Sequence, residues 1–289
     1  MSSRKQYSIG LPGRAPLDLG GRTLIMGIIN VTPDSFADAG RRFDPARAID
    51  DGLLMIADGA DILDVGGEST RPGAEPVDAG EELRRVLPVV EALARDGRVP
   101  VSIDTYKAAV AREAVASGAT IVNDVSGLQY DTDLAPVVSG AGAALVLMHN
   151  RGRSSEMYRG AVYEDVACEV GRELEAAIAR ATRGGIPRDR LILDPGFGFA
   201  KRAEHTWESL ARLDRLAELD RPILVGPSRK SFLTAATGER SPAERDWATA
   251  AAVTASVLAG AHIVRVHAVR EMVDVVRASD RLRAAAIRH

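Results

Sequence analysis

Short runs of apolar residues recur along the whole chain. They alternate with longer segments in which apolar and polar positions are spaced as in amphipathic helices. The short runs are rich in β-branched residues or leucine and show no polar alternation, which is typical of strands buried on both faces. Eight of them can be counted: LIMGII at 24–29, DILDV at 61–65, VPVSI at 99–103, TIVN at 120–123, AALVLM at 143–148, LIL at 191–193, PILV at 222–225 and HIVRV at 262–266.

The longer segments predict helices between these strands. Four clear examples are PARAIDDGLLMIADG at 45–59, EELRRVLPVVEALARDG at 81–97, AAVAREAVASG at 108–118 and EDVACEVGRELEAAIARATRGG at 164–185. They end in glycine, a common residue just beyond helix C-termini. Eight β/α units in 289 residues predict a single domain over 1–289 with its core at about 22–286.

The expected architecture is an eight-stranded parallel (β/α)8 TIM barrel. An open doubly wound sheet is the alternative. It is less favoured, because no Gly-rich dinucleotide fingerprint follows the first strand.

Composition narrows the class of protein. Hydrophobic residues make up 46% of the chain, enough for a substantial core. The net charge of −3 does not imply non-specific binding to nucleic acid. Cys168 is the single cysteine, so no intramolecular disulfide can form and a reducing cytoplasm fits. The first residues carry no long apolar stretch and no run of 18 apolar residues occurs, so we expect neither a signal peptide nor a membrane span.

Nearly every predicted strand ends on a polar residue, and a barrel brings these ends together in one mouth. Single members have ordinary explanations: Asp104 could cap the next helix, Asp124 and Asp194 could form turns, and His149 could have a structural role in its loop. Together they would be costly to desolvate without a ligand. The residues are Asn30, Asp64, Asp104, Asn123, His149, Asp194, Ser228, Arg229, Lys230, Arg265 and His267.

The residue types indicate the kind of ligand. Carboxylates and amides from several strands suit a flat heterocycle with ring N–H and amino donors. Phosphate or diphosphate suits the cations and imidazole, namely Arg71, Lys230, Arg265 and His267. Asn30 offers a neutral oxygen that can serve Mg²⁺ when phosphate supplies most other ligands. A zinc site is not expected, because one cysteine and five scattered histidines give no ligand spacing.

Seven segments containing these residues resemble the motifs of one enzyme family, the dihydropteroate synthases. They occur in the family's order and cover about residues 22–270. The segments are IMGIINVTPDSFADAG at 25–40, GADILDVGGESTRPGA at 59–74, SIDTYK at 102–107, NDVSG at 123–127, LDPGFGFAK at 193–201, GPSRKSF at 226–232 and IVRVH at 263–267.

The resemblance implies the same barrel, a homodimer through the last helices, and a reaction that joins 6-hydroxymethyl-7,8-dihydropterin diphosphate to p-aminobenzoate. It assigns Asp104, Asn123, Asp194 and Lys230 to the pterin, with Asp104 and Lys230 as catalytic residues. It assigns Thr70, Arg71, Arg265 and His267 to the diphosphate. It assigns Phe36, Pro72 and Ser228 to p-aminobenzoate, and Asn30 to Mg²⁺.

Two long polar loops, after the first and second strands, are expected to close over the substrates. The chain departs from the family's usual residues at Ala39, Thr234 and Ala268, and Ala268 could leave His267 less firmly oriented. Two alternatives stay open. A pterin-dependent methyltransferase would need no diphosphate site, and a catalytically silent paralogue would have lost residues such as Lys230 or Arg265.

Overall fold

The computed structural model describes residues 4–32, 44–70, 73–153 and 158–287. Its main sheet has eight strands: β3 (Leu24–Asn30), β4 (Ile62–Gly66), β5 (Val101–Asp104), β6 (Ile121–Asp124), β7 (Ala144–Met148), β8 (Leu191–Asp194), β9 (Leu224–Val225) and β10 (Ile263–Val266). The helices are α1 (Pro45–Asp58), α2 (Ala79–Asp96), α3 (Ala108–Ala116), α4 (Leu134–Ala141), α5 (Val166–Arg183), α6 (Ala203–Ala211), α7 (Thr234–Thr237), α8 (Asp246–Ala259) and α9 (Val269–Ile287).

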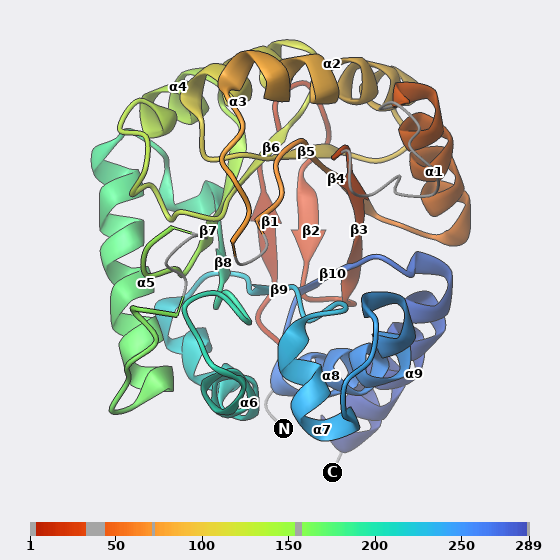
Figure 1. Ribbon diagram of the computed structural model, residues 1–289, viewed down its shortest axis with the longest axis vertical. Coiled ribbons are helices and arrows are strands. Elements are labelled where there is room, and N and C mark those ends of the chain that lie inside the picture. Colours follow the sequence, from red (N-terminus) through yellow and green to blue (C-terminus); the bar gives the residue numbers. More distant parts are fainter. Residues whose placement is uncertain (1–3, 33–43, 71–72, 154–157, 288–289) are drawn as a thin grey trace.

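The eight strands form a parallel barrel inside a ring of helices (Figure 1). Their order is β8-β7-β6-β5-β4-β3-β10-β9, so the first strand of the barrel lies between the second and the last. A parallel bridge between Leu193 and Ile223 connects the two ends of this order. The predicted (β/α)8 barrel is therefore confirmed, and the open doubly wound sheet is excluded. All eight predicted strands are present, with ends shifted by two residues at most.

Local sequence signals explain where several helices begin and end. Asp44 and Asp78 cap α1 and α2 by accepting backbone N–H groups of Ala46 and Glu81. Gly59 and Gly97 follow these helices in the left-handed conformation, with φ of 108° and 74°. The predicted glycine ends of these two helices are thus confirmed.

The pattern of apolar runs did not reveal an N-terminal hairpin made of β1 (Tyr7–Ile9) and β2 (Leu17–Leu19). Buried side chains of the hairpin, including Ile9 and Leu19, form one cluster with residues at the starts of barrel strands, such as Leu24 and Ile62. The hairpin therefore covers the amino-terminal end of the barrel. The carboxyl ends of the strands, where the predicted site residues lie, form the opposite mouth.

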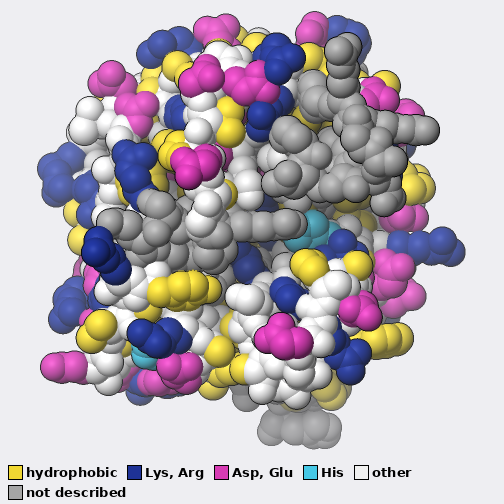
Figure 2. Space-filling model, viewed as in Figure 1, with side chains coloured by type: hydrophobic (Ala, Val, Ile, Leu, Met, Phe, Trp, Pro, Cys, Tyr) yellow, Lys and Arg dark blue, Asp and Glu magenta, His cyan; other side chains and the backbone are white. Residues whose placement is uncertain are grey.

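The surface shows no strong segregation of charge over the described part of one face. Basic and acidic side chains are interspersed there in Figure 2. No helix among the described residues combines the length and apolar character that a membrane span requires.

Candidate active site

Four polar side chains from four strands meet in a hydrogen-bonded cluster at the mouth. Asp64 is fully buried on β4, and its Oδ2 accepts hydrogen bonds from Asn123 Nδ2 at 2.8 Å and from Arg265 Nε at 2.6 Å. Arg265 Nη2 also donates to Asp104 Oδ2 at 2.7 Å. One guanidinium thus connects two carboxylates, and one of these carboxylates orients the Asn123 amide.

The barrel register explains why these residues meet. Asp104 on β5 lies directly beside Asn123 on β6 and beside Gly66 on β4. Asp64 lies two residues before Gly66, so it points to the same face of the strand. A Cβ on Gly66 would lie 3.3 Å from the Cβ of Asp104, so the glycine leaves room for this carboxylate.

Asp104 is not a helix cap. Helix α3 begins at Ala108, whose N–H is accepted by Asp131, and Asp104 contacts Arg265 instead. Burial raises the pKa of Asp104 to about 7, although the positive charge of Arg265 opposes the shift. The Asp104 carboxyl therefore changes charge near neutral pH.

Asp194 ends β8 and is buried. Its Oδ1 accepts the N–H of Gly196 at 2.7 Å, so the turn expected from the sequence is present and fixes the carboxyl group. Burial raises the pKa of Asp194 to about 6; the Gly196 N–H and the charges of Lys230, Arg265 and Lys201 act in the opposite direction. Three cations therefore lie close enough to influence this carboxyl.

Lys230 and Phe199 form one wall near Asp194. The Lys230 ammonium lies 3.9 Å from the centre of the Phe199 ring, a cation–π contact. Phe199 is buried and follows the Asp194 turn, and Lys230 follows β9. Phe199 had no role in the sequence prediction. The only sequence signal for Phe199 is its place as the second aromatic residue of the LDPGFGFAK motif. Its partner, Lys230, lies far away in the sequence, so the contact could not be predicted.

His267 links Asn30 and Ser228 on another side of the mouth. Its Nδ1 lies 2.9 Å from Ser228 Oγ, and its Nε2 lies 3.4 Å from Asn30 Nδ2. The Ser228 hydroxyl also accepts the backbone N–H of His267 at 3.2 Å. Both ring nitrogens therefore have neighbours that orient the imidazole, although Ala268 follows it in the sequence.

The loop after β4 is connected to β5 and α2 by an acidic residue. Glu68 accepts hydrogen bonds from Tyr106 Oη at 2.9 Å and from the Val77 N–H at 3.0 Å. It also pairs with Lys107, which in turn contacts the buried Glu82. These contacts fix both ends of the segment that carries Thr70, which is half-buried.

One predicted residue pairs away from this mouth, and several others lie outside the described residues. Arg229 forms two 2.8 Å contacts with Asp246 on α8, so its charge serves that pair. Phe36, Arg71 and Pro72 lie outside the described residues, as does Ala39. Across the described ranges, no group of three or more His, Cys, Asp or Glu residues is arranged to hold a metal ion.

Comparisons with known proteins agree with this geometry. The family model for pterin binding enzymes matches residues 26–267. The chain is 48% identical to the dihydropteroate synthase of Mycobacterium leprae, over 88% of this chain and 91% of that protein. It also resembles two solved structures of the Xanthomonas albilineans enzyme. The complex with 4-aminobenzoic acid has a TM-score of 0.90 and 41% identity, over 97% of this chain and 99% of that one.

The second structure, in complex with 7,8-dihydropteroate, has a TM-score of 0.85 and 38% identity, over 96% of this chain and 99% of that one. These matches confirm the family that the seven sequence motifs resemble. They span nearly the whole length of both partners, and the family model includes residues of all eight barrel strands. The chain therefore belongs to the dihydropteroate synthase family of pterin-binding enzymes.

Proposed function

We propose that the mouth of this barrel joins the methylene carbon of 6-hydroxymethyl-7,8-dihydropterin diphosphate to the amino nitrogen of p-aminobenzoate. The products are 7,8-dihydropteroate and diphosphate. One observation carries the proposal: Asp104 and Asp194 share their surroundings with the cations Arg265 and Lys230. Such a mouth can bind an uncharged ring with N–H donors and an anionic leaving group at the same time.

The pterin would lie against Asp104, Asn123, Asp194 and Lys230. Asp194 has one oxygen on the Gly196 N–H, so its carboxylate plane is fixed before the pterin amino and ring N–H groups arrive. Asn123 is held by Asp64, and Lys230 rests on the Phe199 ring. These supports reduce the reorganisation that binding would otherwise require.

Diphosphate would lie beside Arg265, His267 and Thr70, with Arg71 outside the described residues. In Arg265, Nε and Nη2 contact carboxylates, which leaves Nη1 as the nitrogen that diphosphate oxygens would contact. Ser228, next to His267, would stand between the diphosphate and p-aminobenzoate sites. Phe36 and Pro72, the other residues assigned to p-aminobenzoate, also lie outside the described residues.

Mg²⁺ is the proposed cofactor, with Asn30 as its protein ligand. The Asn30 side chain contacts His267 through its amide nitrogen, so its amide oxygen is the atom suited to coordinate the ion. One neutral oxygen fits Mg²⁺, which keeps several waters and takes further ligands from substrate phosphates. When bound, the ion would supply positive charge beside the departing diphosphate.

In the reaction, the bond between the methylene carbon and diphosphate breaks and diphosphate leaves with the bonding electrons. The amino nitrogen of p-aminobenzoate forms the new bond to that carbon and loses a proton. Positive charge that develops on the pterin would be stabilised by the Asp104 carboxylate. Because burial raises the pKa of Asp104 to about 7, this stabilisation increases as the pH rises through neutrality.

Two rival functions are less well supported. A methyl transfer on the same barrel would not need a diphosphate site, which Arg265, His267 and Thr70 would form here. A catalytically silent paralogue would be expected to have lost a residue such as Lys230 or Arg265, and the chain has both. We also propose a homodimer through the last helices, supported by two exposed apolar side chains, Trp247 on α8 and Leu282 on α9. A cytoplasmic location stays a prediction that rests on the single cysteine.

The activity is tested with purified protein, p-aminobenzoate, the pterin diphosphate and Mg²⁺. We expect equimolar dihydropteroate and diphosphate when all three are present, and neither product when any one is omitted. The variant Arg22→Met serves as a folded control, because the Arg22–Asp61 pair belongs to the opposite end of the strands. The synthase proposal would be falsified if well-folded wild-type protein formed no dihydropteroate.

A further inference from the structure

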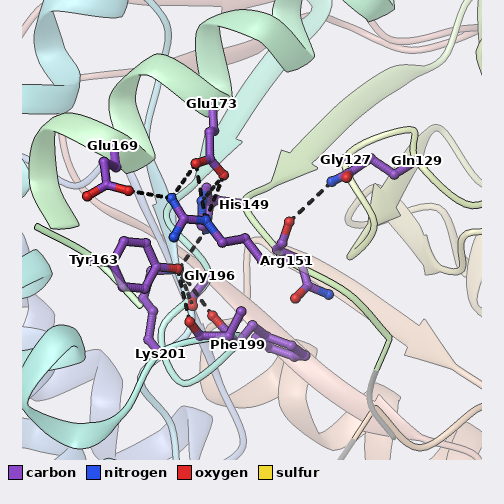
Figure 3. A network of polar contacts seen from close by, with 12 residues as sticks. Gly127, Gln129, His149, Arg151, Tyr163, Glu169, Glu173, Gly196, Phe199 and Lys201 are labelled. Atoms are coloured by element: carbon purple, nitrogen blue, oxygen red, sulfur yellow. Dashed lines mark hydrogen bonds and ion pairs between the residues drawn. The ribbon is translucent and has the colours of Figure 1, made fainter. Parts of the chain in front are cut away.

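A buried lysine, Lys201, contacts Gly196 and Phe199 in the turn that follows Asp194 (Figure 3). Lys201 is 1% exposed, and its Nζ lies 2.8 Å from His149 Nδ1. The same nitrogen lies 3.2 Å from the carbonyl oxygens of Gly196 and Phe199. His149, in turn, has its Nε2 3.0 Å from the carboxylate of Glu173 on α5. The chain of contacts therefore runs from the turn through two basic side chains to an acid.

The number of protons on this pair follows from the contacts. A Lys201 ammonium has three N–H donors for two carbonyls and one imidazole nitrogen, while a neutral His149 donates its Nε2–H to Glu173. If the proton moves to His149, a neutral Lys201 still donates to both carbonyls and accepts from the imidazole. Without that proton, a neutral Lys201 has only two N–H donors for the imidazole nitrogen and the two carbonyls, so one of the three contacts is lost; the geometry therefore favours one shared positive charge on the pair.

The two carbonyls that Lys201 contacts belong to the turn that shapes the pterin site. The Phe199 N–H donates to the Gly196 carbonyl at 3.0 Å, and the Gly196 N–H donates to Asp194 Oδ1 at 2.7 Å. The His149 N–H donates to the Asp194 carbonyl at 2.9 Å. The Phe199 ring supports Lys230. Lys201 therefore fixes the backbone of the turn that carries the Asp194 and Phe199 side chains.

The same turn has a backbone that requires support. Ala200 has φ of 47°, in the left-handed region that L-residues rarely adopt, and its carbonyl accepts a hydrogen bond from Tyr163 Oη at 2.9 Å. Gly196 has φ of 67°, and a Cβ there would lie 2.1 Å from the His149 carbonyl oxygen. Contacts from His149, which follows β7, and Tyr163, which precedes α5, thus keep a strained turn in place.

We propose that Lys201 is a positioning residue for pterin binding, which acts through a protonated Lys201–His149 pair that fixes the Asp194–Phe199 turn. The inference rests on the proposed function, because it takes Asp194 and Lys230 as pterin-binding residues. Lys201 itself does not touch the substrate in this arrangement.

The environment of the Lys201–His149 pair makes its stabilisation of the Asp194–Phe199 turn dependent on pH. Burial lowers the pKa of Lys201 to about 7, and the positive charge of Arg151 adds to this effect. Burial lowers the pKa of His149 further, to about 4, so the shared proton resides mainly on Lys201. The pair therefore loses its proton as the pH rises through neutrality. The titratable groups that face it are Asp194 on β8, Arg151 after β7, Tyr163 before α5, and Glu169 and Glu173 on α5.

The test compares Lys201→Met with Lys5→Met, which removes a lysine paired with Asp220 at the surface. Affinity for the pterin diphosphate is measured by calorimetry at about pH 6 and about pH 9, with thermal unfolding as the check on folding. We expect Lys201→Met to bind roughly tenfold to a hundredfold more weakly than wild type at the lower pH, the scale typical of lost support or a small displacement. The ratio of the dissociation constants of Lys201→Met and wild type should be smaller at the higher pH. Lys5→Met should bind as tightly as wild type at both pH values.

A second pair of variants keeps the test usable if Lys201→Met does not fold. His149→Gln retains one acceptor for Lys201 and one donor for Glu173, so it should bind the pterin diphosphate more tightly than His149→Ala. In wild-type protein labelled at its four lysines, one signal should titrate near neutral pH.

Three outcomes would overturn the proposal: unchanged affinity in folded Lys201→Met, a ratio that is the same at both pH values, or no lysine titrating below about pH 9. Wild-type protein that failed to bind the pterin diphosphate would contradict the proposed function instead.

Discussion

Replacing Arg265 with methionine should destabilise the protein by an amount that depends on pH. The Arg265 side chain is 18% exposed and pairs with Asp64, which is 0% exposed, and Asp104, which is 12% exposed. Methionine has a similar length but no charge, so both carboxylates would lose their cation. Removing one partner from a buried ion pair costs about 3–5 kcal/mol, and we expect a loss of this size at pH 8.

The pH dependence follows from Asp104. Burial raises its pKa to about 7 in the folded protein, compared with about 3.9 in an unfolded chain. Folding therefore takes up a proton between these values, and the resulting stabilisation is present below about pH 4 and lost as the pH rises through about 7. The charge of Arg265 holds this pKa down, so in the variant the pKa is higher and stability falls over a wider range. The gap between variant and wild type should therefore be smaller at pH 5 than at pH 8, because the Asp104 contribution to it disappears at the lower pH.

Urea denaturation at half-unit steps between pH 5 and pH 8 measures this gap as a difference in unfolding free energy. Arg22→Met is the matched control, because Arg22 is 61% exposed and its pair with Asp61 should contribute no more than about 1 kcal/mol at any pH. A gap for Arg265→Met that stayed constant with pH would refute the role given to Asp104. A gap below about 1 kcal/mol at pH 8 would refute the importance of the buried pair.

Two further predictions concern the ligands. Asp194→Asn removes the charge and one acceptor where pterin N–H groups are expected, so calorimetry should show pterin affinity reduced by about tenfold to a thousandfold without loss of fold; unchanged affinity would exclude Asp194 from the pterin site. p-Aminobenzoate should bind better once Mg²⁺, pterin and diphosphate are present, by about 5- to 150-fold, because the loop with Thr70 would form part of both sites. Equal affinity in titrations with and without those ligands would show that the second site is preformed.

The barrel could be predicted from the sequence because each strand is a continuous apolar run. Buried parallel strands need no polar alternation, and runs such as 143–148 are long enough to stand out from the amphipathic segments around them. The N-terminal hairpin gave no such signal. Its strands have three residues each, and they form because Ile9 and Leu19 cover the amino-terminal end of the barrel, which is a long-range contact.

The position of the site was also predictable, whereas its pairings were not. Polar residues at strand ends must gather at one mouth, as Asp104, Asn123 and Arg265 do. Asp64 is expected at the same mouth, but its pairing with both Asn123 and Arg265 depends on the alignment of several strands and could not be predicted. His149 was expected to be structural; its partner Lys201 lies 52 residues away and became visible only in three dimensions.

Arg265 would contact the diphosphate and also pairs with Asp104, which is assigned to the pterin. A change of charge on the pterin would therefore alter the interaction between Arg265 and the diphosphate. Before substrates bind, the guanidinium pairs with both Asp64 and Asp104. Diphosphate would compete with these carboxylates for the same cation. Positive charge that develops on the pterin during bond cleavage would compensate Asp104 at the moment when the leaving diphosphate most needs Arg265. A single arginine shared by two carboxylates can therefore favour the transition state over the bound substrate, because its interaction with diphosphate strengthens as the bond breaks.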